Sequence, residues 1–339
     1  MPTETAENPN TIAAQLAEPL EVGDPDIAGP LAVFPLFGPE PGREYRAYAD
    51  AVADGVEIRE LPGGASVNNL VIDNPTEHEV LLFEGEEVLG AQQNRSVDIT
   101  VLAPSRAKVT VPVSCVEAGR WDGARHDESM RQAPQASNPR MRRMKSVQVR
   151  ARAMAGAEAR ADQGAVWEEA DRLADDYGAD APTRATHDVF ESRRHSLDEL
   201  CNAIALHDKQ IGAIASYGGE LQVLDLVSRP TAFASLHRRI VQGYALDALG
   251  SGAGLDTAPA ETAAGRGFAL LVCDSEIAQR ERGVGVGENV RFAANGVAGS
   301  GLVAEGELIQ LTAFPGDESD QDFRRTVPQG RIRRPSRRR

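Results

Sequence analysis

Two neighbouring segments, RSVDITVL (95–102) and VTVPVSCVE (109–117), place apolar residues at every second position. Side chains two residues apart lie on the same face of a β-strand, so each segment has one apolar face. If the strands pair across the short link APSRAK, these faces must coincide, because a shift of one residue would turn one of them to solvent. The segments therefore predict an antiparallel hairpin, for which two registers are possible.

The register determines which polar side chains meet at the end of the buried face. When Val101 opposes Val111, Arg95 opposes Glu117; in the neighbouring register, Arg95 opposes Cys115. Both registers place the arginine and the glutamate beside the core. Removing one member of a buried ion pair costs about 3–5 kcal/mol, so buried charges need each other or a ligand. Two interpretations follow: an ion pair that closes the end of the sheet, or a polar pocket.

Planar amides, an arginine and an indole surround this end of the hairpin. Such groups suit a ligand with a flat ring and an anionic or hydroxyl-rich part. If the pocket catalyses hydrolysis, Glu86, Glu87 and Glu117 are the candidate acid and base; otherwise EGEE (84–87) is a charged turn. The predicted ligand-binding residues are Glu84, Gln93, Asn94, Arg95, Cys115, Glu117, Arg120 and Trp121.

The sequence contains no recognisable cofactor or metal motif, and we predict neither. The histidines lack metal-ligand spacing such as H-E-x-x-H. RGVGVGENVRF (282–292) contains Gly-x-Gly-x-Gly, but we expect a strand after it, whereas a dinucleotide-binding loop opens a helix. Cys115 has no histidine nearby in sequence to act as a base, so we interpret it as a buried, inert thiol. Three widely spaced cysteines also argue against a disulfide framework.

Segments typical of strands lie on both sides of a segment rich in helix-forming Ala, Arg and Glu. This order lacks regular strand–helix alternation. It predicts an α+β fold, an antiparallel β-rich domain with a central helical insertion and a helix packed on the sheet. The chain is predicted to consist of a flexible acidic lead-in (1–28), a single domain (29–316) and a disordered Arg-rich tail (317–339). Within the domain, residues 29–120 are expected to be β-rich, 121–206 helical and 207–316 α+β.

Local signals predict three elements near the C-terminal end of this domain. Two strands within 211–227 are joined at YGGE, which indicates a hairpin. FALLVCD (268–274) is interpreted as a strand. An amphipathic helix is expected at 229–250, with Thr231 as its N-cap. The buried face of that helix is predicted to comprise Phe233, Leu236, Ile240 and Tyr244.

The 339 residues carry a formal net charge of −15. No apolar run approaches the roughly 18 residues of a membrane helix, and the N-terminus lacks the features of a signal peptide. We therefore expect a cytoplasmic protein without membrane contact. An acidic domain repels nucleic acid. The Arg-rich tail (317–339) is nevertheless a candidate site for an acidic partner or nucleic acid. The alternative is that the tail is solvated or folds back onto the acidic domain. The tail arginines are Arg331, Arg333, Arg334, Arg337, Arg338 and Arg339.

Two blocks, LLFEGEEVLGAQQNR (81–95) and VPVSCVEAGRW (111–121), together with VFPLFGP (33–39) and QGAVW (163–167), are similar to the ARG- and rhodanese-phosphatase-superfamily-associated protein domain family. The resemblance covers about residues 28–316. One of the associated domains is ADP-ribosylglycohydrolase, so the resemblance implies a role near ADP-ribose or NAD chemistry. Residues that match its motifs are Glu84, Gly85, Glu86, Gln93, Asn94, Arg95, Cys115, Glu117, Arg120 and Trp121.

Three functions are compatible with these observations. The first is a ligand-binding or regulatory domain with its pocket at the end of the 95–117 hairpin. The second is a hydrolase acting on a nucleotide- or ADP-ribose-type substrate. The third is an interaction scaffold that docks through its basic tail.

Overall fold

The computed structural model describes residues 8–252, 260–294 and 296–316. The Arg-rich tail, and with it the predicted binding of an acidic partner or nucleic acid, lies outside these residues. Within them the chain forms three β-sheets, whose strand pairs are mostly antiparallel, together with seven α-helices. This is the α+β class that the sequence predicts.

The largest sheet contains strands from both ends of the described chain. In these residues its strands are β1 (Glu21–Val22), β2 (Asp26–Ala28), β3 (Leu31–Phe37), β13 (Gly212–Tyr217), β14 (Glu220–Val227), β15 (Gln279–Arg282), β16 (Glu288–Ala294), β17 (Val297–Ala304) and β18 (Glu307–Pro315). They lie in the order β1-β3-β13-β14-β18-β17-β16-β15, and β2 also pairs with β3. The hairpin predicted within 211–227 is confirmed, because β13 pairs with β14 and places Tyr217 opposite Glu220.

Two smaller sheets carry the blocks on which the predicted site depends. Their strands are β4 (Tyr45–Ala47), β5 (Glu57–Arg59), β6 (Asn69–Asn74), β7 (Glu79–Leu82), β8 (Glu86–Leu89), β9 (Arg95–Val97), β10 (Val101–Ala103), β11 (Ala107–Cys115) and β12 (Arg131–Ala136). One sheet has the order β12-β8-β9-β11-β6-β5 and the other β10-β7-β4. Strand β12 lies in the segment expected to be helical, so that expectation is wrong for residues 131–136.

The hairpin adopts the second of the two predicted registers. Arg95 of β9 lies opposite Cys115 of β11. The strand expected at 95–102 is nevertheless interrupted: Val101 pairs with Leu82 of β7, and Val111 pairs with Leu70 of β6. One strand of the predicted hairpin therefore contributes to two sheets.

Asp98 lies where the strand is interrupted. Its buried carboxylate accepts hydrogen bonds from Ser114 Oγ at 2.8 Å and from the Ala161 backbone N–H at 3.1 Å, and it lies 2.9 Å from Lys145 Nζ. A buried charge is tolerated when it is paired and hydrogen-bonded in this way. These partners come from segments far apart in sequence, so alternation along one strand does not reveal them.

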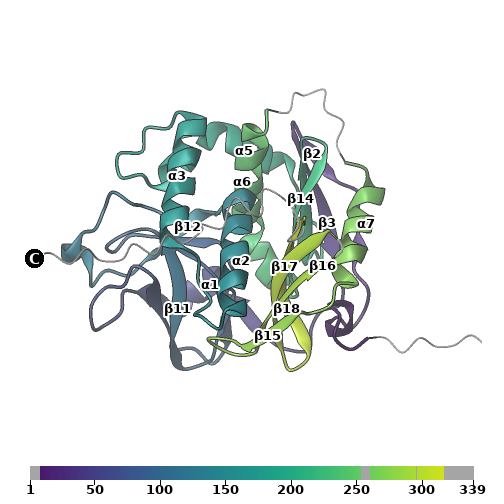
Figure 1. Cartoon of the computed structure of the whole chain (residues 1–339), viewed down its shortest axis with the longest axis horizontal. Coiled ribbons are helices and arrows are strands. Elements are labelled where there is room, and N and C mark those ends of the chain that lie inside the picture. The colour runs from purple at the N-terminus through teal and green to yellow at the C-terminus, as the bar shows by residue number, and fades with distance from the viewer. Residues whose placement is uncertain (1–7, 253–259, 295, 317–339) are drawn as a thin grey trace, which may run out of the picture.

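The helices lie between the sheets and on the outer face of the largest sheet (Figure 1). The α-helices are α1 (Tyr48–Ala51), α2 (Pro139–Met154), α3 (Gln163–Tyr177), α4 (Thr186–Ser192), α5 (Arg194–Ala203), α6 (Pro230–Gly250) and α7 (Thr262–Cys273). Short 3₁₀ turns are η1 (Ala13–Gln15), η2 (Val52–Asp54) and η3 (Gly123–Arg125). Helices α2 to α5 form the predicted central insertion, between β12 and β13.

Helix α6 packs against both the largest sheet and β12, and it forms the centre of the molecule. Its predicted apolar face is buried, and each large side chain that leaves water contributes about 1.5–3 kcal/mol. The predicted N-cap is wrong: the N-cap is Arg229, without a side-chain cap hydrogen bond, and Pro230 occupies the first turn. Proline is favoured there because its φ already suits a helix.

Two expectations near the ends of the domain are also wrong. Residues 268–273 belong to α7 instead of a strand, because a short apolar run does not by itself distinguish the two. The expected lead-in joins the fold from residue 8: Ile12 is buried, and β1 and β2 pair with β3. The polar composition of the expected lead-in gives no indication of these few contacts.

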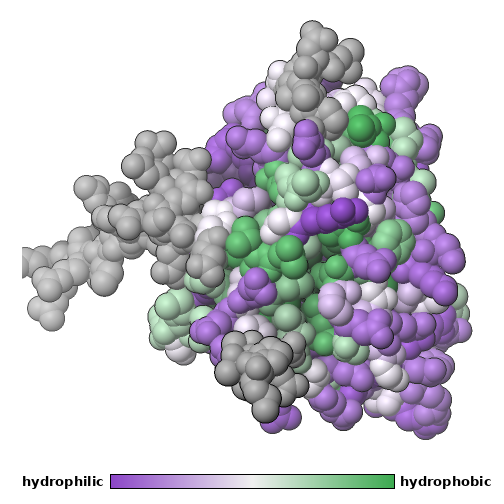
Figure 2. Space-filling view, turned by 90° about the vertical axis from the view of Figure 1, so that its right-hand side faces the viewer, coloured by the Kyte–Doolittle hydropathy of each residue, from purple (hydrophilic) through white to green (hydrophobic). Residues whose placement is uncertain are grey.

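Helix α7 covers the outer face of the largest sheet, and Figure 2 shows apolar side chains gathered near the middle of that side of the molecule. Leu270 and Leu271 of α7 are both exposed. A groove of about 690 Å³ lies between α7 and residues 13–22.

Candidate functional site

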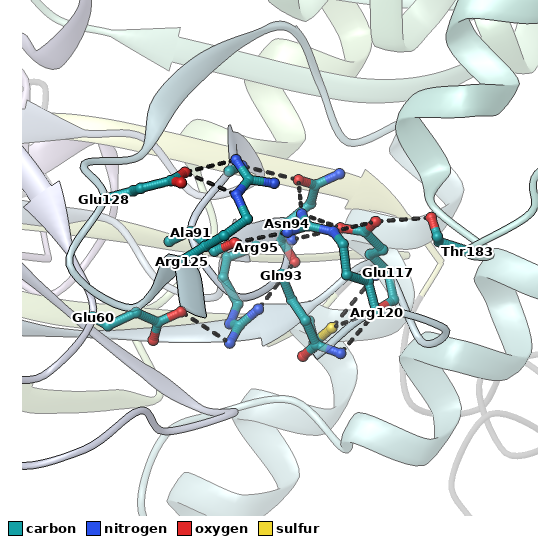
Figure 3. A network of polar contacts seen from close by, with 12 residues as sticks. Glu60, Ala91, Gln93, Asn94, Arg95, Glu117, Arg120, Arg125, Glu128 and Thr183 are labelled. Carbon is teal, nitrogen blue, oxygen red and sulfur yellow. Dashed lines mark hydrogen bonds and ion pairs between the residues drawn. The ribbon is translucent and has the colours of Figure 1, made fainter. Parts of the chain in front are cut away.

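Most of the predicted site residues lie together at one end of the six-stranded sheet (Figure 3). The turn between β8 and β9 supplies two amides, the paired strands β9 and β11 supply Arg95 and Cys115, and the segment after β11 supplies the others. The structure brings together Gln93, Asn94, Arg95, Cys115, Glu117, Arg120 and Trp121.

Glu117 is the centre of a hydrogen-bond network. One of its oxygens accepts from the Asn94 backbone N–H at 3.0 Å and from Arg120 Nη2 at 2.6 Å. The other accepts from Arg120 Nε and Thr183 Oγ1, each at 2.8 Å. Burial acts to raise the pKa of the Glu117 carboxyl, but these donors outweigh it and hold the pKa below its usual value. The carboxylate therefore joins the β8–β9 turn to the segment before α4.

Arg120 completes the same network on the other side. Its guanidinium donates to the Ala91 carbonyl at 2.7 Å and to Asn94 Oδ1 at 3.1 Å. It is therefore the cationic partner of Glu117, and the predicted ion pair between Arg95 and Glu117 does not form. The prediction failed because Arg120 lies on an irregular segment whose direction strand alternation does not give.

Arg95 is the largest completely buried side chain in the described part of the chain. Its Nη1 donates to the Asn94 carbonyl at 3.4 Å, and its Nη2 lies 3.6 Å from Glu60 Oε1. Among the described residues, its Nε and Nη2 have no hydrogen-bond partner. Burial lowers the pKa of the guanidinium, and the neighbouring Cys115 and Glu60 only partly offset this effect.

Glu60 is a site residue that the sequence analysis missed. It follows β5, its side chain is buried, and neither carboxylate oxygen has a hydrogen-bond partner within residues 8–252, 260–294 and 296–316. Burial raises the pKa of the carboxyl, and Arg95 and the nearby Gln92 backbone N–H only partly oppose this effect. A signal was present in the sequence: alternation from Val56 through Ile58 places Glu60 on the same face as these two buried side chains.

Unpartnered polar atoms gather around this pair. The side-chain carbonyl oxygens of Gln92 and Gln93 also lack hydrogen-bond partners among the described residues, and both side chains are buried. Gln93 Nε2, by contrast, donates to the Glu117 carbonyl at 3.0 Å. The cluster is therefore polar and closed, and its donors and acceptors are not all used by the protein.

Cys115 lies opposite Arg95 and is buried. Its thiol donates to the Glu117 carbonyl at 3.3 Å. Burial raises the pKa of the thiol, although Arg95 acts in the opposite direction. At neutral pH the thiol form is therefore favoured, and it is the thiolate that acts as a nucleophile.

Glu84 belongs to a different network. It accepts a hydrogen bond from Ser300 Oγ at 2.8 Å and lies 4.0 Å from Arg142 Nη2. Arg142 in turn binds the Asp225 carboxylate through two hydrogen bonds of 2.7 and 2.5 Å. This buried network joins α2 to the largest sheet, and it separates Glu84 from the residues around Arg95.

Glu86 and Glu87 are buried in β8, so EGEE is not a solvated turn. Glu86 accepts from the Phe83 backbone N–H at 2.7 Å and from Gln132 Nε2 at 2.5 Å. Glu87 accepts from Ser137 Oγ at 2.7 Å, among other side chains. Burial raises the pKa of both carboxyls, but protein donors occupy both oxygens of each.

Trp121 is the solvent-facing member of the cluster, with 50% of its surface exposed. Its ring lies 5.8 Å from the Arg95 guanidinium carbon. Backbone hydrogen bonds fix the segment on either side of it: Gly119 N–H donates to the Thr183 carbonyl, and Met130 N–H donates to the Ile58 carbonyl, both at 2.8 Å. Residues 119–130 thus form a covering segment with anchored ends.

A family model described as the ARG and Rhodanese-Phosphatase-superfamily-associated Protein domain matches residues 19–314. The chain belongs to this family. No curated protein and no solved structure matches it. The family's domain begins before β1 and ends within β18, so it includes part of the expected lead-in and starts earlier than the predicted boundary near residue 28.

In residues 8–252, 260–294 and 296–316, no three or more His, Cys, Asp or Glu side chains are arranged to hold a metal ion. Over the same ranges, no helix has both the length and the apolar character needed to span a bilayer.

Proposed function

We propose that this chain is a ligand-binding domain whose ligand binds to Arg95 and Glu60 after Trp121 moves aside. The observation that carries the proposal is the shortage of partners at this pair: Arg95 Nε and Nη2 and both Glu60 oxygens form no hydrogen bond within the described residues. Buried polar groups in natural proteins nearly always have a partner from the protein, ordered water or a ligand. A ligand that offers both acceptors and donors would satisfy these atoms.

The two unpartnered nitrogens of Arg95 define the first part of the ligand. Nε and Nη2 lie on one edge of the guanidinium, and that edge binds carboxylate or phosphate through two parallel hydrogen bonds. Glu60, as an acceptor, suits a hydroxyl group of the same ligand. Trp121, which is half exposed, offers a flat surface for a ring. Nucleotides and ADP-ribose have all three features, in agreement with the ADP-ribose or NAD role that the family resemblance implies.

Trp121 also marks the route by which a ligand would enter. Arg95, Cys115 and Glu117 are all buried, whereas Trp121 has half of its surface in solvent. Displacement of the indole would expose the Arg95 guanidinium without disturbing the hydrogen bonds between Glu117 and Arg120. We therefore expect ligand binding to change the fluorescence of Trp121.

Isothermal titration of the full chain with ADP-ribose, NAD, AMP and inorganic phosphate tests this proposal. Wild type should bind at least one of the organic ligands, and the double variant Arg95→Met/Glu60→Leu should bind none. Replacing both members of a buried pair by apolar residues of similar size is often neutral or stabilising, so the double variant should fold. Arg106→Ala, which removes an exposed arginine paired with Glu77, is the matched control and should bind as wild type does. Equal binding by the double variant would contradict the proposed site.

A hydrolase acting on a nucleotide- or ADP-ribose-type substrate is the second candidate function. Its support is the raised pKa of Glu60, which burial causes and which suits a general acid beside a bound anion. Glu117 fits this role less well, because its pKa is lowered and both oxygens are occupied. The expected signature is that Glu60→Gln retains binding but loses turnover. Turnover that survives in Glu60→Gln would exclude Glu60 as the acid.

A further inference from the structure

Helix α7 presents an apolar face to solvent on the outer side of the largest sheet (Figure 1). Leu270 and Leu271 are 63% and 45% exposed, and apolar side chains gather on this side of the molecule (Figure 2). A soluble protein rarely leaves a large apolar patch in water, so such a face indicates a surface that another molecule covers. It shares no residue with the Arg95 site, and it bears on a property beyond the function proposed above.

Two charged residues lie on the same face of the helix. Arg266 lies four residues before Leu270, and Asp274, the C-cap, lies four residues after it and still has right-handed helical φ and ψ. Residues four apart lie above one another on a helix, so these three side chains form one row. Both charged residues are exposed, and neither side chain has an ion pair or a hydrogen bond within the part of the chain that the structure describes.

This row is complementary to itself. If a second α7 lies antiparallel across the first, with a two-fold axis beside Leu270, Arg266 of each copy lies opposite Asp274 of the other. The two charges are separated by about 12 Å of helix in both copies, so both ion pairs can form at once. We propose that this chain forms a symmetric dimer through α7. Leu270 and Leu271 meet the same residues of the second copy, and two ion pairs between Arg266 and Asp274 flank them.

The charges favour a second copy in this orientation over other occupants. A parallel pair of helices would place Arg266 opposite Arg266 and Asp274 opposite Asp274, which is repulsive. A different protein would have to present both charges at the right separation around an apolar centre, whereas symmetry supplies this pattern from one sequence. Gly267 is also exposed, and a Cβ added there would meet no described atom within 4 Å, so its missing side chain leaves room for a second helix to approach closely.

The groove beside α7 extends the proposed contact. A stable interface buries about 800 Å² on each partner, so contacts beyond one helix face are needed. The groove of about 690 Å³ is lined by Leu16, Leu20 and Leu270, which adds apolar surface next to the row. Because the two-fold axis is perpendicular to α7, the grooves of both copies lie on the same side of the helix pair. Glu18 and Glu21 also line the groove, but they are exposed and can remain hydrated.

Sedimentation velocity of the full-length protein over a series of concentrations tests the proposal. Wild type should change from monomer to dimer as its concentration rises. Leu270→Glu/Leu271→Glu should raise the dissociation constant on the order of a hundredfold, because apolar contacts are replaced by charges. Leu206→Glu is the matched control, because Leu206 is 45% exposed, as Leu271 is, but lies outside α7; it should dimerise as wild type does.

Charge reversal tests the antiparallel arrangement separately. Arg266→Asp and Asp274→Arg each replace both ion pairs by like charges, so each variant alone should dimerise on the order of tenfold more weakly. An equimolar mixture of the two variants should dimerise at least as well as wild type, because every opposed pair in the mixed dimer is then an aspartate with an arginine. All of these side chains are exposed, so the variants should fold, and circular dichroism verifies this.

Three results would overturn the proposal. Wild type that stays monomeric at every concentration would show that something other than a second copy covers this face. A dimer that survives Leu270→Glu/Leu271→Glu would place the interface elsewhere. A mixture of the two charge variants that dimerises no better than either variant alone would exclude the antiparallel pairing of Arg266 with Asp274.

Discussion

Arg95 Nη2 lies 3.6 Å from Glu60 Oε1, and neither side chain is exposed to solvent. Each of these residues extends the buried face of a strand: Arg95 begins β9, and Glu60 follows β5. The fold thus places two opposite charges beside the core at a separation too long for a hydrogen bond. Glu117, with its full set of donors, is instead part of the framework that holds this end of the sheet.

The Glu117–Arg120 pair should be important for stability. Arg120→Ala leaves the Glu117 carboxylate buried with fewer donors, and breaking a buried pair costs about 3–5 kcal/mol. We expect a loss toward the lower end of that range, because 19% of the Arg120 side chain is exposed. Urea unfolding at pH 7 measures it. Arg125→Ala is a closely matched control, because Arg125 pairs with Glu128 at the same three-residue spacing but in solvent. Its stability should be almost unchanged, and equal losses in the two variants would contradict this account.

The cost of Arg120→Ala should also depend on pH. The pKa of Glu117 is lowered in the folded protein, so its contribution to stability is present above the ordinary glutamate pKa and is lost as pH falls through the folded value. Wild type and Arg120→Ala should therefore become more similar in stability in acid. Unfolding curves recorded between pH 7 and pH 3 test this. A difference that stays constant over that range would indicate that Arg120 acts through packing alone.

Glu60 should show the opposite pH dependence. Burial raises its pKa in the folded protein, so its contribution is fully present below the ordinary glutamate pKa and is lost as pH rises through the folded value. Glu60→Gln resembles the protonated form and should be more stable than wild type at pH 8 but similar to it at pH 4. Each unit by which the pKa is raised adds about 1.4 kcal/mol to the difference at high pH. If Glu60→Gln is the less stable protein at pH 8, attraction by Arg95 outweighs the cost of burying the carboxylate.

Strand alternation was sufficient to locate Arg95, Cys115 and Glu117 at the edge of the core, and all three are buried there. It did not identify the ionic partners, because these depend on segments that approach from elsewhere in the chain. Arg120 lies on an irregular segment, and Glu60 follows a strand 35 positions before Arg95. The alternation of Val56, Ile58 and Glu60 places Glu60 at the edge of the core in the same way that the alternation around Arg95 places Arg95 there.

The order of the predicted strands and helices was sufficient to predict the fold class. Predictions of single helices and strands failed where only a few residues distinguished a helix from a strand. The apolar run FALLVCD does not distinguish a strand from a buried helix face, and the preceding residues extend it into the twelve-residue α7. Pro134 and an irregular register obscure β12. The cavity lined by Met144, Val147, Leu173 and Phe314 was not predicted, because these side chains come from three separate segments, α2, α3 and β18.

Gly85 should be intolerant of any side chain. Its φ of +87° lies in the left-handed region, and a Cβ there would lie 2.7 Å from Arg142 Cδ. Gly85→Ala should lose about 1–2 kcal/mol from the backbone alone, and more because Arg142 is held by Asp225 and cannot move freely. Gly64→Ala is the control, because Gly64 also has a positive φ, +126°, but no described atom lies within 4 Å of its Cβ position. Thermal unfolding of the two variants separates the contributions, and equal losses would show that Arg142 moves aside at no cost.

Arg142 should be the strongest single link between α2 and the largest sheet. Its guanidinium binds Asp225 at 2.7 and 2.5 Å, and the same carboxylate accepts from Tyr244 OH at 2.6 Å and Thr312 Oγ1 at 2.7 Å. Arg142→Met removes the only cation that hydrogen-bonds to Asp225 in the described part of the chain, so it should cost about 3–5 kcal/mol.

The double variant Arg142→Met/Asp225→Asn tests the origin of this loss. Asparagine keeps an oxygen that accepts from Tyr244 or Thr312 but carries no charge, so most of the stability should return if the unpaired carboxylate causes the loss. Urea unfolding of wild type, both single variants and the double variant gives the coupling energy between the two residues. A double variant no more stable than Arg142→Met would show that the guanidinium stabilises the contact between α2 and the sheet mainly by its packing against Phe83, whose ring lies 4.8 Å from it.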